Sequence, residues 1–210
     1  MRITSLNLPR LKKVGHEFLC YNESLTSLSL PNLEETGNDF LYNNQSLTSL
    51  SLPNLEKVGG RFLYCNDGLT SLSLPNLVEV GDGFLCYNMD LTSLDLPKME
   101  KAGDRFCRSN EGITSLEAPS LEKVGNSFLY HNQSLTSLEV PSLVEVEHDF
   151  LYRNTNLVSL VAPSLVRVRQ NFLFYNRNLT SLEVPKLKKV GGGFLLHNKA
   201  SLGKALVLCR

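Results

Sequence analysis

The chain has 210 residues, of which 42% are hydrophobic and 20% are charged, and its formal net charge is zero. This composition is typical of a folded protein and excludes an extended disordered chain. A net charge of zero also argues against a molecule whose whole surface binds nucleic acid. No apolar run reaches the length that spans a membrane, and the opening residues, MRITSLNLPR, lack the apolar stretch of a secretory signal.

From Ile3 onward the sequence divides into nine units of 22 residues with no insertion or deletion. They begin at Ile3, Leu25, Leu47, Leu69, Leu91, Ile113, Leu135, Leu157 and Leu179. Their shared pattern is LTSLxLPxLxxVGxxFLxxNxx, and a fixed period of this length indicates a solenoid in which each unit is one coil. We therefore expect one domain over residues 1–210, with repeats over 3–200 and a partial cap over 201–210.

Each unit opens with LTSLSL or a close variant, which predicts a short strand with inward-pointing leucines. A proline follows in all nine units and ends the strand, because it has no N–H to donate to the ladder. The next landmark is the Val-Gly site, where a glycine follows Val (or Thr36, Ala102) in seven units and predicts a turn with positive φ; Glu147 and Arg169 are the exceptions. No segment is long enough for an ordinary helix, and a 3₁₀ turn near GNSF is the most that we expect.

Two residue types then recur at fixed sites in every unit. Phenylalanine recurs from Phe18 to Phe194, and because stacked coils lie about 4.8 Å apart, the rings should form a continuous spine in the core. Asparagine recurs from Asn22 to Asn198, which predicts a ladder of inward-facing amides bonded to their neighbours and to backbone.

These repeats resemble the BspA-type subclass of leucine-rich repeats. VGGRFLYCNDGL, residues 58–69, matches the second half of that repeat position for position, with Leu63 at the family's Phe and Asn66 at its Cys or Asn. The unit here is one residue shorter than is usual in the family. A weaker likeness, in LPNLEKVGG, is to receptor-L-type domains of fungal wall proteins. With the period, the resemblance implies a mainly β, right-handed leucine-rich-repeat solenoid with one parallel β-sheet, nine coils and little or no α-helix.

BspA-type repeats occur in surface proteins of oral and gut bacteria and of some parasitic protists. The resemblance therefore implies a non-enzymatic scaffold that binds a protein or glycan, at the cell surface if the chain is a fragment. One alternative is an intracellular interaction scaffold or host-directed effector, which is the expectation if Met1 is the natural start. The other is a purely structural solenoid with no specific partner.

Nothing in the sequence predicts catalysis. GxSxG, HExxH and phosphate-loop motifs are absent. The four histidines fall at two repeat sites and are not alike in adjacent coils. We therefore expect no enzyme, no cofactor and no metal site. The five cysteines match no metal-ligand spacing. They are either reduced thiols in a non-oxidising compartment or diagonal disulfides between neighbouring turns.

Tyrosines form the first candidate binding surface, because tyrosine gives rigid contact area with a polar tip. One site just before the asparagine carries Tyr42, Tyr64, Tyr130, Tyr152 and Phe174, and the next carries Tyr21, Tyr87 and Tyr175. The alternative is that the rings lie flat over the coil edge and shield the phenylalanine spine.

Charged residues form two further candidates. Asp95, Glu117 and Glu139 occupy the outward central site of three consecutive strands, where their mutual repulsion favours a cation or a basic partner, or else a solvated acidic edge. Residues 158–210 hold nine basic residues and one acidic residue, whereas residues 25–156 hold eight basic and eighteen acidic. This basic end could meet an acidic partner or an anionic surface, and it comprises Arg167, Arg169, Arg177, Lys186, Lys188 and Lys189.

Another column of charged residues alternates in sign between most neighbouring coils, from Lys13 and Glu35 to Arg167 and Lys189, and predicts ion pairs across coils.

The two ends of the solenoid give further predictions. Solenoids need polar caps, and the first unit has none, so either a longer protein has been cut or another chain covers Ile3, Leu6 and Leu8 by end-to-end association. At the other end, Ala205–Leu208 would add one last strand as a partial lid.

Overall fold

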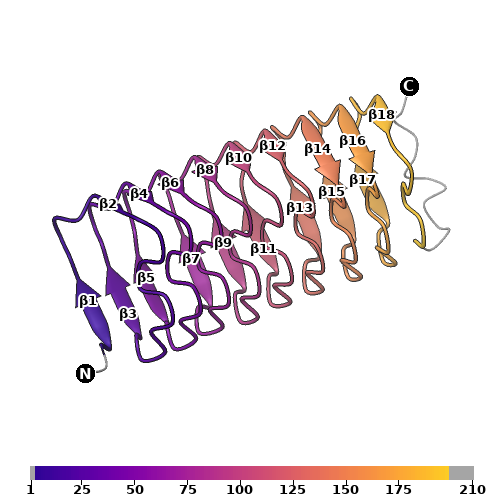
Figure 1. Cartoon of the computed structure of the whole chain (residues 1–210). Helices are drawn as coiled ribbons and strands as arrows, with labels where there is room; N and C mark the ends of the chain where they lie inside the picture. Colours follow the sequence, from indigo (N-terminus) through magenta and orange to yellow (C-terminus); the bar gives the residue numbers. More distant parts are fainter. Residues whose placement is uncertain (1–2, 199–210) are drawn as a thin grey trace.

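The structure is a computed structural model that describes residues 3–198. The chain winds into one elongated solenoid with its two ends far apart, and each coil contributes two short strands (Figure 1). The described residues contain no α-helix and no 3₁₀ turn. The mainly β leucine-rich-repeat solenoid predicted from the repeats is therefore confirmed. The predicted cap at Ala205–Leu208 lies outside the described residues.

The first strand of each coil is formed by the middle of LTSLSL. These strands are β1 (Ser5–Asn7), β3 (Ser27–Ser29), β5 (Ser49–Ser51), β7 (Ser71–Ser73), β9 (Ser93–Asp95), β11 (Ser115–Glu117), β13 (Ser137–Glu139), β15 (Ser159–Val161) and β17 (Ser181–Glu183). They pair in parallel with like residues opposite one another, for example Leu28 opposite Leu50.

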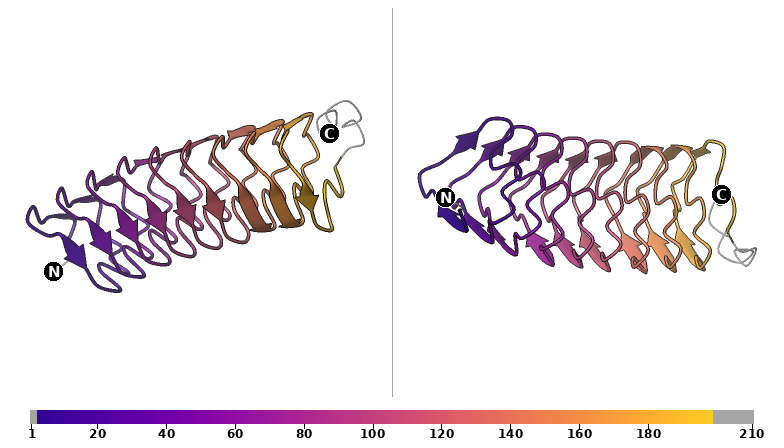
Figure 2. Two further views of the ribbon diagram at one scale, coloured as in Figure 1. Left: turned by 90° about the horizontal axis from the view of Figure 1, so that it is seen from above. Right: turned by 60° about the horizontal axis from the view of Figure 1, so that its bottom comes forward.

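The second strand of each coil includes the valine position of the Val-Gly site. These strands are β2 (Lys13–Val14), β4 (Glu35–Thr36), β6 (Lys57–Val58), β8 (Glu79–Val80), β10 (Lys101–Ala102), β12 (Lys123–Val124), β14 (Glu145–His148), β16 (Arg167–Gln170) and β18 (Lys189–Val190). They run along the opposite edge of the solenoid from the leucine strands (Figure 2).

The expectation of one parallel sheet is corrected by these pairings. The second strands form one continuous nine-stranded sheet, whereas the leucine strands divide into three sheets of three, interrupted between β5 and β7 and between β11 and β13. Two-residue strands are too short to show the alternation of apolar and polar residues by which a strand is recognised in a sequence.

The core consists of columns of like side chains. Leu25, Leu28 and Leu30 of the second coil are buried, as are their equivalents in most later coils. The phenylalanine spine is confirmed, since successive rings from Phe18 to Phe194 lie 4.9–5.8 Å apart between centroids. Each fully buried ring contributes roughly 1.5–3 kcal/mol, so the spine is a main source of stability.

The asparagine ladder is also confirmed, with a different bonding pattern from the one expected. In seven of the eight junctions the backbone N–H of one asparagine donates to Oδ1 of the next, at 2.5–3.1 Å, rather than amide to amide. The Nδ2 group donates to a carbonyl of the preceding coil, as from Asn66 to Leu41 at 2.9 Å. Each internal amide therefore ties two neighbouring coils together.

The third side of each coil, between the second strand and the asparagine, has an unusual backbone. Three alternate residues have positive φ in every coil, such as Asp39, Leu41 and Asn43 at 55–61°. Such a conformation costs a non-glycine residue about 1–2 kcal/mol. It is offset here because all three N–H groups donate to neighbouring coils, at 2.8–2.9 Å.

The glycine of the Val-Gly pair therefore does not have the role that we predicted. The described glycines with positive φ are Gly83 and Gly193, which lie at the first of the three alternate sites instead. The Val-Gly glycine is needed because coils approach closely: a Cβ on Gly81 would lie 2.7 Å from the backbone N of Gly60. Where Glu147 and Arg169 replace it, the second strands β14 and β16 lengthen to four residues.

The junction between the seventh and eighth coils differs from the others. It is the one described junction that lacks the ladder bond, and Oδ1 of Asn176 is buried with no described partner. The rings of Phe150 and Phe172 are tilted by 41°, compared with 6–16° elsewhere in the spine. On the opposite edge, Glu147 and Arg169 form an ion pair at 2.7 Å.

Candidate binding surface

The third side of the solenoid carries the predicted tyrosines. Phenylalanine and the residue after it point inward, and the following residue points outward, so the rings at that site stack above one another half-buried. Tyr42 and Tyr64 lie 5.2 Å apart at 8°, and Tyr130 and Tyr152 lie 4.8 Å apart at 2°. Phe174 continues the second stack at 4.9 Å from Tyr152.

The tyrosines one residue later divide between the same two groups. Near the N-terminus, Tyr21 and Tyr87 tilt against the first stack. Near the C-terminus, Tyr175 meets Phe174 edge to face at 4.8 Å and stacks on His197 at 4.4 Å. The structure therefore forms two aromatic clusters, which Cys86 and Arg108 separate at the stacking site.

Burial changes the acidity of several groups on this side. It raises the pKa of Tyr64 to about 12 and that of the Cys86 thiol to about 11. It also raises the pKa values of Cys20, Cys65 and Cys107. These four cysteines are unpaired, which agrees with reduced thiols, and Cys209 lies outside the described residues. Their thiols are therefore poor nucleophiles at neutral pH.

The predicted acidic residues lie on the leucine strands, on a different side of the coil. Asp95 and Glu117 are paired neighbours in register, but Glu139 lies beyond the interruption between β11 and β13. Asp95 accepts a hydrogen bond from Ser73 at 2.9 Å. Within residues 3–198, no cluster of three carboxylates, thiols or imidazoles could hold a metal ion. Binding of a cation or a basic partner at this stripe stays a prediction.

The basic end does not converge on one place. A groove on the nine-stranded sheet is lined by Arg167, Arg169, Lys188 and Lys189, and Lys186 is exposed outside it. Arg167 and Arg169 are paired with Glu145 and Glu147 at 3.1 and 2.7 Å, which neutralises part of the predicted patch.

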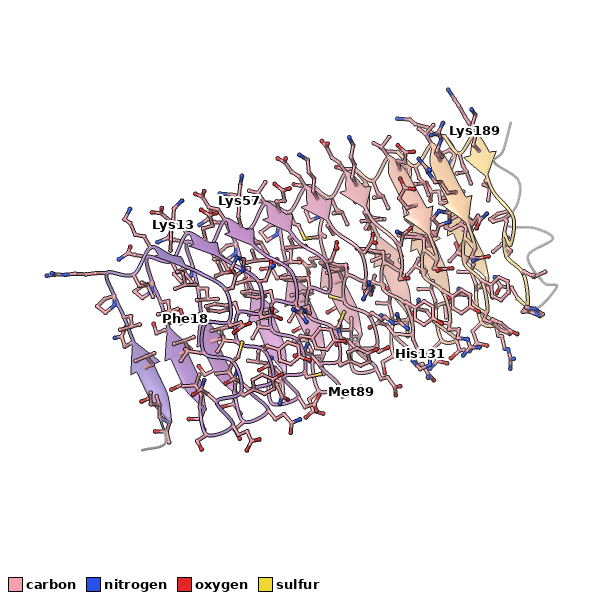
Figure 3. All side chains as sticks on the ribbon, in the orientation of Figure 1. Lys13, Phe18, Lys57, Met89, His131 and Lys189 are labelled. Atoms are coloured by element: carbon pink, nitrogen blue, oxygen red, sulfur yellow. The ribbon has the colours of Figure 1, made fainter. Side chains whose placement is uncertain are left out.

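Arg177, the sixth residue of the predicted basic end, lies on the third side of the coil, close to Tyr175. Figure 3 shows His131 on the opposite long edge of the solenoid from Lys189.

Ion pairs across coils form at some of the predicted positions. Lys13 and Glu35 are 2.6 Å apart, and each holds the other charged: the pair lowers the pKa of Glu35 and raises that of Lys13. Lys12 and Glu34 pair beside them at 2.8 Å. These exposed pairs favour the stacking of coils only weakly.

The sequence interpretation missed a groove on the third side, in the C-terminal half. It is lined by His131, Gln133, Arg153, Thr155, Tyr175 and Arg177. Of these, Tyr175 and Arg177 were candidates. The remaining four could have been found by writing the units above one another, because they stand in two outward columns beside the asparagine ladder.

Comparison with known sequences places the repeat in a family. A profile described as BspA type leucine rich repeat region, with six copies, matches residues 1–106 and 84–200. The chain belongs to the BspA-type leucine-rich repeat family. No curated protein sequence matches this BspA-type chain.

One solved structure supports the same fold. A leucine-rich repeat protein from Bacteroides ovatus is 16% identical, with a TM-score of 0.58, over 85% of this BspA-type chain and 57% of its own. A leucine-rich cell surface protein from Faecalibacterium prausnitzii is 14% identical, with a TM-score of 0.39, over 91% of this chain and 72% of its own. The chain thus spans little more than half the length of the Bacteroides ovatus protein.

The described part of this BspA-type solenoid contains no helix with the length and apolarity that a membrane crossing requires. The first coil lies at the end of the described chain, where Ile3 is 45% exposed and Leu6 and Leu8 are only partly buried. End-to-end association through these side chains stays a prediction.

Proposed function

We propose that the chain is a non-enzymatic recognition module that binds a protein or glycan partner through the aromatic clusters of its third side. The observation that carries this proposal is the outward stack of Tyr130, Tyr152 and Phe174, with rings 4.8–4.9 Å apart. Rings fixed in this way offer contact area with little loss of conformational entropy on binding.

The backbone beneath the stack supports the same proposal. The N–H groups of Ser109, His131 and Arg153 donate to carbonyls of neighbouring coils at 2.8–2.9 Å, which fixes the height and direction of the side chains between them. A partner would therefore meet a preformed surface. Repeat solenoids commonly use such extended surfaces for binding.

We propose a cell-surface location, because BspA-type repeats occur in surface proteins. The second candidate, an intracellular interaction scaffold or host-directed effector, is favoured by the four unpaired cysteines. Labelling intact cells of the source organism with a membrane-impermeant biotin reagent distinguishes them. Labelled protein supports the surface location, whereas labelling only after lysis supports the alternative.

Substitution of two stacked tyrosines tests the binding role. The full chain is screened against arrays of extracellular proteins and glycans, and Kd is measured for each saturable partner. We expect Tyr130→Ser with Tyr152→Ser to weaken binding by about tenfold or more, since aromatic anchors dominate binding surfaces. Ser115→Ala with Ser137→Ala, on exposed sites of the leucine strands, is the matched control and should bind as the parent does.

The same experiment separates the alternatives. If the tyrosine variant melts at a lower temperature but binds its partner unchanged, the rings only shield the core and the proposal is wrong. If the parent binds no partner saturably, the solenoid is purely structural.

A further inference from the structure

The groove of the C-terminal half is built from two neighbouring columns on three successive coils. One column carries His131, Arg153 and Tyr175, and the other carries Gln133, Thr155 and Arg177. Together they line a groove of about 330 Å³. His131 marks its position on the lower edge in Figure 3.

The positive charge of the two arginines in this groove is not neutralised by any residue that the structure describes. Cζ of Arg153 and Cζ of Arg177 lie 5.3 and 5.7 Å from the ring centroid of Tyr175, so both guanidinium groups flank one ring. Among residues 3–198, no carboxylate lies within 4.0 Å of either arginine. The nearest recorded acidic contact is Glu111, 3.7 Å from Nδ1 of His131 at the edge of the groove.

The groove beside the N-terminal aromatic cluster differs from this one in its charge. There a second groove is lined by Tyr21 and Tyr42 together with Arg61, Glu17 and Asp39. Arg61 is paired with Asp39 at 2.7 Å, so its charge is already satisfied. The two grooves have similar rings and opposite electrostatic character, and only the C-terminal one favours an anion.

The other residues that line the groove indicate which chemical groups a ligand would carry. Gln133 and Thr155 can donate and accept hydrogen bonds with hydroxyl groups. Tyr175 is stacked on His197 at 4.4 Å, which covers one face of its ring and fixes the orientation of the ring. Hydroxyl partners, a ring face and paired guanidinium groups together suit a sugar that carries a carboxylate or a sulfate.

Backbone hydrogen bonding argues against a peptide in this groove. The N–H groups of His131, Arg153 and Tyr175 donate to Tyr152, Phe174 and Leu196 at 2.9–3.0 Å. No N–H of this column is therefore left to pair with an added strand, which is how extended peptides commonly gain affinity. Only side chains face the ligand.

The two arginines lie on successive coils but in different columns, because Arg177 follows Arg153 by one 22-residue unit plus two residues. We propose that this groove binds an acidic polysaccharide, with a sugar ring against Tyr175 and its carboxylate or sulfate groups between Arg153 and Arg177. This inference rests on the proposed function and names the ligand class of that surface.

Binding of defined saccharides to the full chain tests the inference. The probes are a heparin oligosaccharide, which is sulfated, an oligogalacturonate, which carries only carboxylates, and a neutral dextran oligosaccharide of matched length. We expect saturable binding to one or both acidic probes, weakening as salt is added, and none to dextran. The acidic probe that binds identifies the anionic group.

Matched double variants then locate the site. Arg153→Gln with Arg177→Gln should weaken binding by about tenfold or more, because both charge-assisted contacts are lost. Lys57→Gln with Lys123→Gln removes the same charge from exposed sites on the opposite edge and should leave binding unchanged. Circular dichroism checks that both variants are folded.

Several results would overturn the inference. These are no binding of either acidic probe, equal binding of dextran, equal loss in both double variants, or displacement by polyglutamate at the same concentration as by the saccharide. If a different partner is bound and lost in Tyr130→Ser with Tyr152→Ser but kept in Arg153→Gln with Arg177→Gln, the proposed function stands and this inference fails.

Discussion

Asn110 illustrates what a single buried carboxamide contributes. Its Oδ1 accepts the N–H of Asn88 at 2.5 Å, and its Nδ2 donates to the carbonyl of Leu85 at 2.6 Å. It therefore satisfies two buried backbone groups of the preceding coil. Water is excluded from the site, because the side chain is fully buried.

Asn110→Ala should lower the free energy of unfolding by about 2–4 kcal/mol, because each orphaned buried group costs about 1–3 kcal/mol. Denaturant titration followed by circular dichroism measures the change. Asn178→Ala, at an exposed site two residues after the ladder asparagine of the eighth coil, is the control and should change stability little. Equal effects of the two substitutions would contradict the ladder.

Cys86 makes stability depend on alkaline pH. Its thiol is 1% exposed and donates to the carbonyl of Arg105 at 2.8 Å, and its pKa rises from 9.0 to about 11. A pKa raised by folding contributes stability that is complete below the unfolded value and is lost as pH rises through the folded value. The stability that the protonated thiol contributes is therefore lost as the pH rises from 9.0 to about 11.

We expect the stability advantage of the parent over Cys86→Ala to shrink by about 2–3 kcal/mol between about pH 8 and about pH 11. The comparison must be a difference between the two proteins, because Tyr64 and Cys107 titrate late for the same reason. Denaturant midpoints across this range give the difference. A constant difference would show that burial of Cys86 does not alter its ionisation.

The positions of some individual residues could be predicted from the sequence, and those of others could not. Phe and Asn recur without exception, so their inward position follows from repetition alone. The glycine was predicted at the right site for the wrong reason, since the sequence does not reveal how closely coils approach. Positive φ at Leu41 and its equivalents had no signal, because leucine has no preference for that conformation.

At the scale of the coil, stacking depends on the glycine that follows the second strand. A Cβ on Gly81 would lie 2.7 Å from N of Gly60 and 2.8 Å from C of Gly59, and backbone atoms cannot move aside cheaply. Gly15 occupies the same site in the first described coil, where a Cβ would meet nothing within 4 Å.

Gly81→Ala should therefore destabilise the protein by about 1–3 kcal/mol, the usual cost of overpacking. Gly15→Ala should be neutral or slightly stabilising, because alanine restricts the unfolded chain. Thermal melting of the two variants beside the parent measures both effects. A fall of equal size in Gly15→Ala would mean that the glycine serves its own backbone rather than its neighbour.

Elements were predictable where the repeat gave them length. LTSLSL shows alternation and a following proline, and its strands lie where we expected them. The second strands, such as Lys57–Val58, have two residues, and their continuous sheet became visible only in the structure. The groove around Tyr175 was missed in part because Arg153 and His131 are informative only as members of a column.

At the scale of the molecule, the junction between the seventh and eighth coils lacks contacts that the other described junctions have. The ladder bond is missing there and the phenylalanine rings tilt, while the ion pair of Glu147 with Arg169 holds the opposite edge. Repeat proteins are stabilised by nearest-neighbour interfaces, so a weak interface can open separately from the rest.

Hydrogen exchange should reveal this junction. The N–H of Asn132 donates to Oδ1 of Asn154 at 2.7 Å, whereas the N–H of Asn154 has no recorded acceptor among residues 3–198. We expect the amide of Asn154 to exchange faster than those of Asn110 and Asn132, as measured by NMR or by mass spectrometry. Equal protection of the three amides would mean that the ladder runs unbroken through all nine coils.

Because all units have the same length, the solenoid should tolerate the deletion of a whole unit. Every unit enters and leaves its coil at the same point, so excising residues 69–90 would bring Gly68 onto Leu91 without shifting any later side chain out of register. The solenoid can therefore be lengthened or shortened by whole coils, while the groove that contains Arg153 and Arg177 keeps its geometry.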